Sequence, residues 1–387
     1  MDGTRAPASG AAAAAVRKAH ARSADPDAAV AAIRAGLGVG QFALIALFVS
    51  HEGDFARISA GVRAACPEAA LIGCTTAGEI SPAGYASGEV VALGFPASAF
   101  AAELLTIDDV NSIDQQAVGM SAIRARAALA DARPDWRRDC AFLLVDGLSM
   151  KEEDVAAALS TALGPTPLFG GSAGDGLAFR ETRVMANGDV RCNAAVVALI
   201  RTRCPIHTFR LDHHRPTVIR MVVTAADPAR RLVREINAEP AAREYARILG
   251  QDPEQLSPFI FAANPVLVRI GGQHHVRAIR EVAPNGDLVF FSAIDEGLVL
   301  TLADPDDIAL HLEREMKALA EPAAPSLVLA CDCLLRRVEA EQKQATAAVS
   351  RLLAAHNVIG FNTYGEQFNG AHVNQTMTGL AIYPPED

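Results

Sequence analysis

Apolar runs and helical patterns alternate in the first part of the chain. Residues 41–50 form a continuous apolar run between polar residues, which is typical of a strand covered on both faces. A helical pattern follows over residues 54–65 and ends before Pro67, and residues 70–73 form a second short buried strand. The order strand, helix, strand predicts a parallel pair joined by a crossover helix.

The remaining pattern continues the mixture of strands and helices. Strands are predicted at 90–95, 100–107, 141–145, 217–224, 266–270, 276–279, 288–292, 299–302, 327–330 and 375–383, with a hairpin at Asn187-Gly188. Helices are predicted at 113–130, 152–163, 240–249, 307–320 and 336–355, and an acidic cap followed by proline predicts a further helix start at Asp227. No short-period repeat is visible.

These elements predict an α+β fold. A chain of 387 residues is too long for one ordinary core. We therefore expect two mixed α/β domains, residues 26–213 and 214–387, which pack together with a ligand pocket near their junction. Residues 1–25 lack a strong pattern and are expected to form a flexible leader.

Composition narrows the classes of function. The formal net charge of −10 argues against nucleic acid as the main partner, because a phosphate backbone binds a positive face. No apolar run is long enough to span a bilayer and no signal peptide is recognisable, so we expect a cytoplasmic protein without a membrane partner. Seven scattered cysteines do not form a disulfide framework, and a single Cys331-Asp-Cys333 is weak support for zinc, which takes four ligands.

Two glycine-rich loops follow predicted strands and could in principle carry catalysis. Gly73-Cys-Thr-Thr-Ala-Gly-Glu79 lacks the lysine of a phosphate-binding loop, and Cys74 has no histidine nearby in sequence to activate it. Gly170-Gly-Ser-Ala-Gly174 contains the letters of a nucleophile elbow, but Ser172 is not followed by a helix. We therefore expect no enzyme activity, and a packed thiol at a strand end is the preferred interpretation of Cys74.

Histidines and arginines offer binding chemistry instead. His214 lies at the predicted domain junction, and His372 lies in a stretch rich in glycine, amide and hydroxyl groups that also holds Tyr364, Glu366 and Asn374. This stretch is interpreted as the rim of a ligand pocket. Imidazole is a ready ligand for haem iron. Arg277 could hold a carboxylate from a protein glutamate, an amino acid or a haem propionate.

Several stretches carry a family resemblance. The matching stretches are Ile72-Gly-Cys-Thr-Thr-Ala-Gly-Glu-Ile80 with Gly84-Tyr85, Phe169-Gly-Gly-Ser-Ala-Gly-Asp175 with Asn187-Gly188, Glu235-Ile-Asn-Ala-Glu-Pro-Ala-Ala-Arg-Glu-Tyr245, and Tyr364-Gly-Glu366 with His372-Val-Asn-Gln-Thr376. In these stretches the chain resembles a FIST protein with FIST-N and FIST-C domains. The resemblance covers about residues 40 to 383. It implies a sensory protein in signal transduction that binds a small ligand.

Other stretches are similar to one branch, the nitric-oxide-sensing haemoproteins called NosP. They are Phe290-Phe-Ser-Ala-Ile-Asp-Glu-Gly297, Cys331-Asp-Cys-Leu-Leu-Arg-Arg337, Phe361-Asn-Thr-Tyr-Gly-Glu-Gln367 and Gly272-Gln-His-His-Val-Arg277, where that branch often has an aromatic pair in place of the two histidines. This similarity implies a sensor that binds haem b and nitric oxide and modulates a partner histidine kinase or cyclic-di-GMP enzyme. The sequence leaves open whether the protein forms a homodimer.

The leading hypothesis is thus a haem-binding nitric oxide sensor with His214 or His372 as the iron ligand. Arg277, Tyr364, Glu366 and Asn374 are predicted to complete the binding site. The alternative is a haem-free sensor of an amino acid, in which Arg277 and Glu366 would bind the carboxylate and the amine. An enzyme using Cys74 or Ser172 is the third and least favoured hypothesis.

Overall fold

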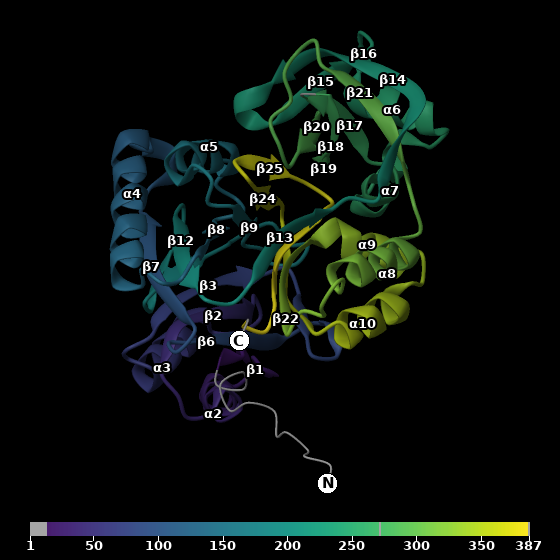
Figure 1. The fold of residues 1–387 in the computed structure, drawn as a ribbon. Helices are drawn as coiled ribbons and strands as arrows, with labels where there is room; N and C mark the ends of the chain where they lie inside the picture. The colour runs from purple at the N-terminus through teal and green to yellow at the C-terminus, as the bar shows by residue number, and fades with distance from the viewer. Residues whose placement is uncertain (1–13, 271, 386–387) are drawn as a thin grey trace.

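The computed structural model describes residues 14–270 and 272–385, and it shows the predicted α+β fold. Three six-stranded sheets form a lower body, and one eight-stranded sheet forms a separate domain above it (Figure 1). We call residues 214–305 the inserted domain, because the chain leaves the body at β13, builds this domain, and returns to the body. The rest of the described chain is the three-sheet body.

The first sheet contains the predicted parallel pair. The strand order is β1(Arg17–Arg22), β6(Glu89–Pro96), β2(Phe42–Ser50), β3(Ala70–Thr76), β10(Val184–Ala186) and β11(Asp189–Arg191). Helices α2(Pro26–Leu37) and α3(Phe55–Ala65) belong to this part, and Asp54 caps α3 by accepting a bond from the N–H of Arg57 at 3.0 Å. β2 and β3 are parallel, so the crossover prediction is confirmed.

The second sheet combines strands from both ends of the chain. Its order is β25(Ala371–Val373), β24(Glu366–Phe368), β9(Leu168–Ser172), β8(Arg138–Val145), β12(Ala195–Thr202) and β7(Phe100–Ile107). The single turn η1(Val110–Ser112) and helices α4(Gln115–Ala132) and α5(Glu152–Leu163) lie between these strands in sequence. The C-terminal hairpin β24–β25 therefore completes a sheet whose other strands come from residues 100–202.

The third sheet combines strands from the C-terminal part of the chain with a hairpin from its N-terminal part. Its order is β13(Ile206–Leu211), β26(Met377–Ile382), β22(Leu327–Cys333), β23(Val358–Thr363), β4(Glu79–Ser81) and β5(Gly84–Ala86). Helices α8(Ile308–Leu319), α9(Leu334–Gln342) and α10(Thr346–Ala355) accompany it. The single helix predicted over 336–355 is thus two helices, because Gln344 adopts a left-handed φ of 55° that breaks the helical path.

The three sheets repeat one plan. Each has a parallel pair joined by one or two helices, an antiparallel return strand, an edge strand, and a short hairpin from another unit. The edge strands β7 and β13 follow the return strand of the preceding unit, and β1 takes this place in the first sheet. The hairpins β4–β5, β10–β11 and β24–β25 are exchanged cyclically among the sheets. The division predicted between residues 213 and 214 falls between β13 and β14, but strand pairing in the second and third sheets crosses it. The body consequently needs both ends of the chain.

The three units share a weak sequence repeat, and its common residue is a glycine in the second strand of each parallel pair. Leu71-Ile-Gly-Cys-Thr-Thr-Ala-Gly-Glu79, Leu168-Phe-Gly-Gly-Ser-Ala-Gly-Asp175 and Val358-Ile-Gly-Phe-Asn-Thr-Tyr-Gly-Glu366 align at the second strand of each parallel pair. A Cβ at Gly73, Gly170 or Gly360 would lie 2.5, 2.1 or 1.8 Å from a carbonyl oxygen of the neighbouring strand. Side chains are thereby excluded at this position in all three units. The period is long and its letters vary, so the sequence pattern did not reveal it.

Aromatic rings join the units in the central core. Phe48 of the first unit stacks on Phe361 of the third, with ring centroids 4.5 Å apart, and meets Phe142 of the second at 6.2 Å. Phe142 in turn stacks on Phe169 at 4.9 Å. All four rings are buried. Such ring pairs add to the free energy gained by burial, so the three units form one core.

The inserted domain is built on an eight-stranded antiparallel sheet. Its path runs β18(Gln273–Arg277), β17(Val266–Ile270), β21(Val299–Pro305), β14(His214–Asp227), β15(Leu232–Ile236), β20(Leu288–Phe290) and β19(Ile279–Val282), with β16(Glu239–Pro240) beside β15. The short helices are η2(Pro228–Arg230), α6(Ala241–Leu249), η3(Pro253–Gln255) and α7(Pro258–Ala263). The helix start predicted at Asp227 is therefore only one 3-10 turn.

The structure also corrects the predicted leader. Residues Arg17–Arg22 form β1, which pairs with β6, so this part of the leader is an ordered edge strand. Residues 1–13 of the predicted leader lie outside the described residues. In the part of the chain that is described, no helix is both long and apolar enough to cross a membrane.

Candidate functional site

The chain crosses between the body and the inserted domain twice, and the two crossings lie side by side. His214 is paired with Pro305 in the sheet, and the N–H of Asp306 donates to the carbonyl of His213 at 2.8 Å. Arg215 and Asp306 form an exposed ion pair next to them. We call residues 212–214 with 305–306 the two-strand connection. A change in angle between two parts of a protein concentrates in a connection of this kind.

A buried ion pair fixes the inserted domain to α5 at another point. Arg231 donates to Glu152 Oε2 and Glu153 Oε2, each at 2.6 Å, and to the carbonyl of Phe291. Arg231 and Glu152 are only 4% and 2% exposed. The two carboxylates stand in the first turn of α5, where the helix dipole favours negative charge. We call this contact the junction ion pair.

Asn374, one of the predicted site residues, also bridges the two parts. Its Oδ1 accepts a bond from the hydroxyl of Ser292 at 2.6 Å and lies 3.5 Å from the N–H of Ala278, both in the inserted domain. The neighbouring Gln375 donates to the carbonyl of Ala262 at 3.1 Å. The polar stretch after β25 therefore serves as a docking surface for the inserted domain, as well as part of the body.

His372 is buried beside this bridge. Its Nδ1 lies 3.2 Å from Gln367 Nε2 and its Nε2 lies 3.4 Å from Asn374 Nδ2. Burial lowers the pKa of His372, although the carboxylates of Glu153 and Glu152 oppose that effect. A neutral imidazole with an amide against each nitrogen has no nitrogen free for a ligand.

Tyr364 lies at the same junction in an aromatic cluster. Its ring is 4.7 Å from that of Phe179 and 6.1 Å from that of Phe291, which belongs to the inserted domain. Its hydroxyl donates to the carboxylate of Asp175 and lies 2.9 Å from the carbonyl of Gly176. Burial raises the pKa of Tyr364, so the group stays a neutral donor. Tyr364 therefore joins the loop after β9 to the inserted domain.

Glu366 has a different place, inside the body. Its carboxylate accepts bonds from the hydroxyl of Thr363 and from the N–H and hydroxyl of Thr376, the latter two at 3.1 and 2.7 Å. Glu79 repeats this in the first unit with Thr76 and the N–H of Glu89. Burial raises the pKa of Glu366 to about 8. Both glutamates fix the start of a return strand, and the chain itself occupies the oxygens of Glu366.

Arg277 stands apart because its charge is not matched nearby. It is half-buried, and among the described residues it forms no ion pair. Its shortest polar contact is 3.5 Å, to the carbonyl of Val276. Burial lowers the pKa of Arg277, and the carboxylate of Glu153 offsets this in part. A half-buried guanidinium without an ion-pair partner is suited to an incoming anion.

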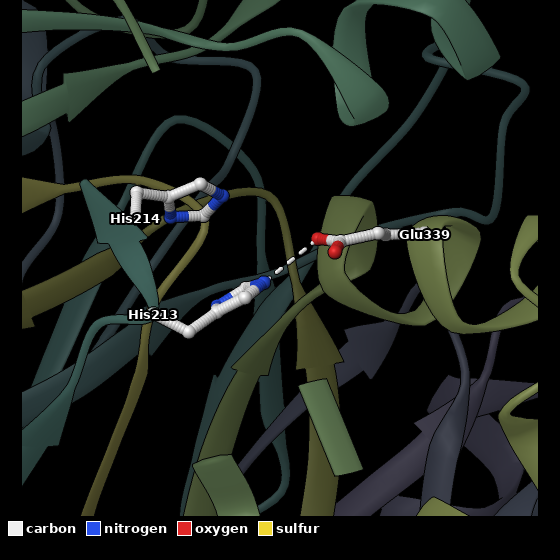
Figure 2. A group of neighbouring side chains, drawn as sticks. All are labelled: His213, His214 and Glu339. Carbon is white, nitrogen blue, oxygen red and sulfur yellow. Dashed lines mark hydrogen bonds and ion pairs between the residues drawn. The ribbon is translucent and has the colours of Figure 1, made fainter. Parts of the chain in front are cut away.

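His213, His214 and Glu339 bring three candidate metal ligand atoms within 4.8 Å of one another (Figure 2). His213 Nε2 lies 2.9 Å from Glu339 Oε2, while His213 Nδ1 faces Arg336 Nη1 at 2.7 Å. Because the guanidinium only donates, Nδ1 must accept and Nε2 must carry the proton. A metal would have to replace that proton beside a permanent cation. The cluster is therefore better explained as a buried charge network that holds the two-strand connection.

The contacts of His214 suit an iron ligand only in part. Its side chain is fully buried, Nδ1 lies 3.1 Å from Asp212 Oδ1, and Nε2 has no partner. A carboxylate behind an imidazole with a free Nε2 is suitable chemistry for an iron ligand. The space is not suitable, because the His213 ring lies 4.1 Å away and Glu339 is within the same small cluster. A porphyrin fits neither here nor at His372 with these contacts in place.

The two candidate nucleophiles are enclosed. Cys74 is fully buried, and burial followed by the charge of Glu79 raises its pKa well above the ordinary value, which disfavours the reactive thiolate. Ser172 is also fully buried, and its hydroxyl lies 3.0 Å from Gln367 Nε2. Cys331 and Cys333 are likewise buried in the core.

The predicted site residues are thus divided among three places. Arg277, Tyr364, His372 and Asn374 gather near the junction, His214 lies in the two-strand connection, and Glu366 lies within the body. The junction ion pair was missed. Its signal in the sequence was Glu152-Glu153 at a predicted helix start, but nothing in the sequence placed Arg231 against it.

Comparison with known families agrees with the resemblance in the sequence. Residues 43–239, more than half of the chain, match the FIST N domain, and residues 241–369 match the FIST C domain. The chain belongs to the FIST family, whose domains are generally held to sense small ligands in signal transduction rather than to catalyse reactions. A comparison with curated proteins finds no match.

Proposed function

We propose that this FIST protein senses a small ligand at the junction between the inserted domain and the three-sheet body. The observation that carries the proposal is Arg277, a half-buried cation without an ion-pair partner among the described residues, beside a polar junction that joins the two parts. Ligand binding at such a junction favours one angle between the parts over another, provided the ligand contacts them unequally. The two-strand connection would absorb the change.

The first test is a thermal-shift screen of the whole protein against a panel of amino acids and small carboxylates. A sensor of this kind gains stability from any ligand that binds only the folded state. Hydrogen exchange with the best ligand should then show protection at residues 212–214, 274–278 and 291–293. If no compound raises the melting temperature, or if protection falls elsewhere, the proposed site is wrong.

A second candidate is the haem-binding nitric oxide sensor implied by the similarity to NosP. The unpartnered Nε2 of His214, with Asp212 behind the ring, favours it. Haem binding would require His213 and Glu339 to move away. Titration of the protein with haemin, read by absorption, should saturate at one equivalent and fail for His214→Ala but not for His372→Ala. Unsaturable binding that is equal in all three proteins would exclude it.

The proposal also includes a signalling partner, which the family resemblance implies. The resemblance supports a histidine kinase or a cyclic-di-GMP enzyme as the protein that responds to the sensor. A change of angle between the inserted domain and the body is a signal that such a partner could read.

A further inference from the structure

The strand β13, at the edge of the third sheet, has one open side. It pairs only with β26 and ends the strand order of its sheet. The N–H of Tyr383 donates to the carbonyl of Pro205, so Pro205 and every second residue after it direct their backbone groups at β26. The backbone N–H and C=O groups of Ile206, Thr208 and Arg210 therefore point away from the sheet. In the described part of the chain, none of these groups forms a hydrogen bond.

Two adjoining clefts lie along this open edge. The larger has a volume of about 710 Å³ and is lined by five consecutive residues of β13, 207–211. The smaller has a volume of about 350 Å³ and is lined by Ile206 and Thr208. Thr208 lines both, so the two clefts meet at the middle of the strand. We call the two clefts together the β13 groove.

The walls of the β13 groove could contact an added strand. Besides β13 itself, they come from the C-terminal half of α8, the turn between β24 and β25, and residues 165–167. A segment that pairs with β13 would lie about 4.8 Å from it, and its side chains would point alternately to the two faces of the sheet. The groove is thus suited to an extended segment, whose backbone pairs with the edge while its side chains contact the walls.

β13 also lacks the protection that edge strands usually have. β1, the edge strand of the first sheet, carries Arg17, Lys18 and Arg22, and β5, β11 and β25 are only three residues long. Charges and short length keep an edge from pairing with another chain. β13 is six residues long, and Arg210 is its only residue with a permanent charge. Such an edge favours the addition of a strand.

The charge of the groove selects the kind of segment that fits it. The arginines that line the groove are Arg126, Arg137, Arg138 and Arg210. None of them has an ion-pair partner among the described residues, whereas the carboxylates in the walls are matched: Asp139 binds Arg201 at 2.8 Å, and Glu315 binds Arg314 at 3.0 Å. This local excess of positive charge contrasts with the formal net charge of −10 of the whole protein. Acidic side chains are complementary to it.

We propose that the β13 groove binds an extended acidic segment of a partner protein, which adds to β13 as a further strand. The inference rests on the proposed function, because it assigns a surface to the signalling partner of the sensor. Pairing with the outward backbone groups of Thr208 and Arg210 supplies affinity, and the arginines select acidic side chains. Gln273, at the start of β18 in the inserted domain, lines the larger cleft. A change of angle between the inserted domain and the body would therefore alter the groove directly.

The experiment combines the full chain with a fluorescein-labelled peptide of about ten residues, in which glutamate and valine alternate as they would along a strand. A peptide with lysine in place of each glutamate is the control for charge. Binding is measured by fluorescence anisotropy. Hydrogen exchange over residues 206–211, with and without the peptide, shows whether the segment pairs with β13.

Two variants of the protein each remove one feature of the groove. Thr208→Pro removes an outward N–H, and proline is tolerated in an edge strand at such a position. Arg210→Gln removes a charge. Thr208→Ala keeps the N–H and is the matched control for the first variant. Arg243→Gln removes a charge that is exposed on α6, and it is the matched control for the second.

We expect the glutamate peptide to bind the wild type and both matched controls alike, and to bind Thr208→Pro and Arg210→Gln about fivefold more weakly or worse, because each has lost a hydrogen bond or a charge. The lysine peptide should not bind. Exchange over residues 206–211 should slow when the glutamate peptide is bound, because the outward N–H groups then have acceptors.

The proposal is overturned if the glutamate peptide does not bind, if the lysine peptide binds equally well, or if exchange over residues 206–211 is unchanged. A dimer of the free protein that Thr208→Pro dissociates would also overturn it, because a second copy of the chain would then occupy the edge. If urea denaturation shows that Thr208→Pro does not fold, Arg210→Gln and the exchange measurement decide. Ligand sensing would survive each of these failures, because the thermal-shift screen tests it at the junction.

Discussion

At the scale of single residues, the strongest constraint on this fold is the absence of a side chain. Gly73, Gly170 and Gly360 each lie where a Cβ would touch backbone of the paired parallel strand. Backbone cannot move aside as a flexible side chain can, so these positions admit glycine alone without distortion. The three glycines can be read from the sequence. Their common role, to let two parallel strands approach closely, depends on strand pairs that only the structure shows.

Replacement of these glycines should destabilise the protein in a graded way. We expect Gly73→Ala to lower the free energy of unfolding by about 3 kcal/mol, Gly170→Ala by more, and Gly360→Ala most, following the clash distances of 2.5, 2.1 and 1.8 Å. Urea denaturation measures the changes. Gly119→Ala, in α4, is the control, because its new Cβ would lie 3.7 Å from the Cβ of Ala162 in α5, and alanine favours a helix by up to about 1 kcal/mol. Equal effects at all four positions would contradict this interpretation.

Glu366 should make the stability of the protein depend on pH. Its folded pKa of about 8 lies above the ordinary value of 4.5. The folded state therefore holds the proton more tightly, and the stabilisation is complete below pH 4.5 and is lost as the pH rises towards 8. When the pH is raised from 5 to 8.5, the urea midpoint should decrease more in the wild type than in Glu366→Gln.

Other titrating groups are common to both proteins, so only the difference between the two slopes is informative. Glu68→Gln serves as the matched control, because Glu68 is exposed and forms no ion pair among the described residues. Its slope should equal that of the wild type. Parallel slopes for the wild type and Glu366→Gln would show that the buried carboxyl does not hold its proton as described.

At the scale of elements, local pattern predicted many helices and strands correctly, but it missed one helix break and one early end of a helix. The predicted helices at 54–65, 152–163, 240–249 and 307–320 correspond closely to α3, α5, α6 and α8. The predicted long helix near the C-terminus is broken at Gln344, and Asp227 starts only η2. A cap and a proline favour a helix start, but the next residues must also prefer the helix over pairing in a sheet. Residues 232–236 instead join β14 as β15.

The junction ion pair should contribute strongly to the contact between α5 and the inserted domain. Replacement of Arg231 by glutamine leaves two carboxylates close together, one of them buried, and we expect it to cost about 3 to 5 kcal/mol. Chemical denaturation gives the total, and faster hydrogen exchange at residues 291–293 gives the location. Arg230→Gln changes an exposed neighbour and should have little effect. Equal stability of the two variants would mean that the ion pair adds nothing net.

At the scale of the whole molecule, the three sheets depend on strands that are distant in sequence. β4 and β5 complete the third sheet, and β24 and β25 complete the second. The predicted division into two contiguous domains at residue 213 stays a prediction. It states that each part would fold when it is separated from the other. The match to the FIST N domain runs past that point, to residue 239.

Fragments of the chain test this division. A fragment of residues 26–213 lacks β22, β23 and β26, so β13 and the β4–β5 hairpin lose the strands with which they pair. We expect it to aggregate or to unfold without cooperativity. A chain in which a short glycine-serine linker replaces residues 215–304 retains all three sheets, and the pairing of His214 with Pro305 brings its ends together. It should unfold cooperatively in urea. Cooperative folding of the 26–213 fragment would instead support two independent contiguous domains.

The sequence by itself determined the kinds of element, the α+β class, the first parallel pair and the membership of the FIST family, because each depends on local periodicity or on short motifs. It also selected Arg277, His372, Asn374 and Tyr364, which the fold places near one junction. Only the tertiary structure decided the cyclic exchange of hairpins and the pairing of Arg231 with α5. Those features depend on which distant segments meet and on which charges are already matched there, and neither is encoded in the spacing of residues along the chain.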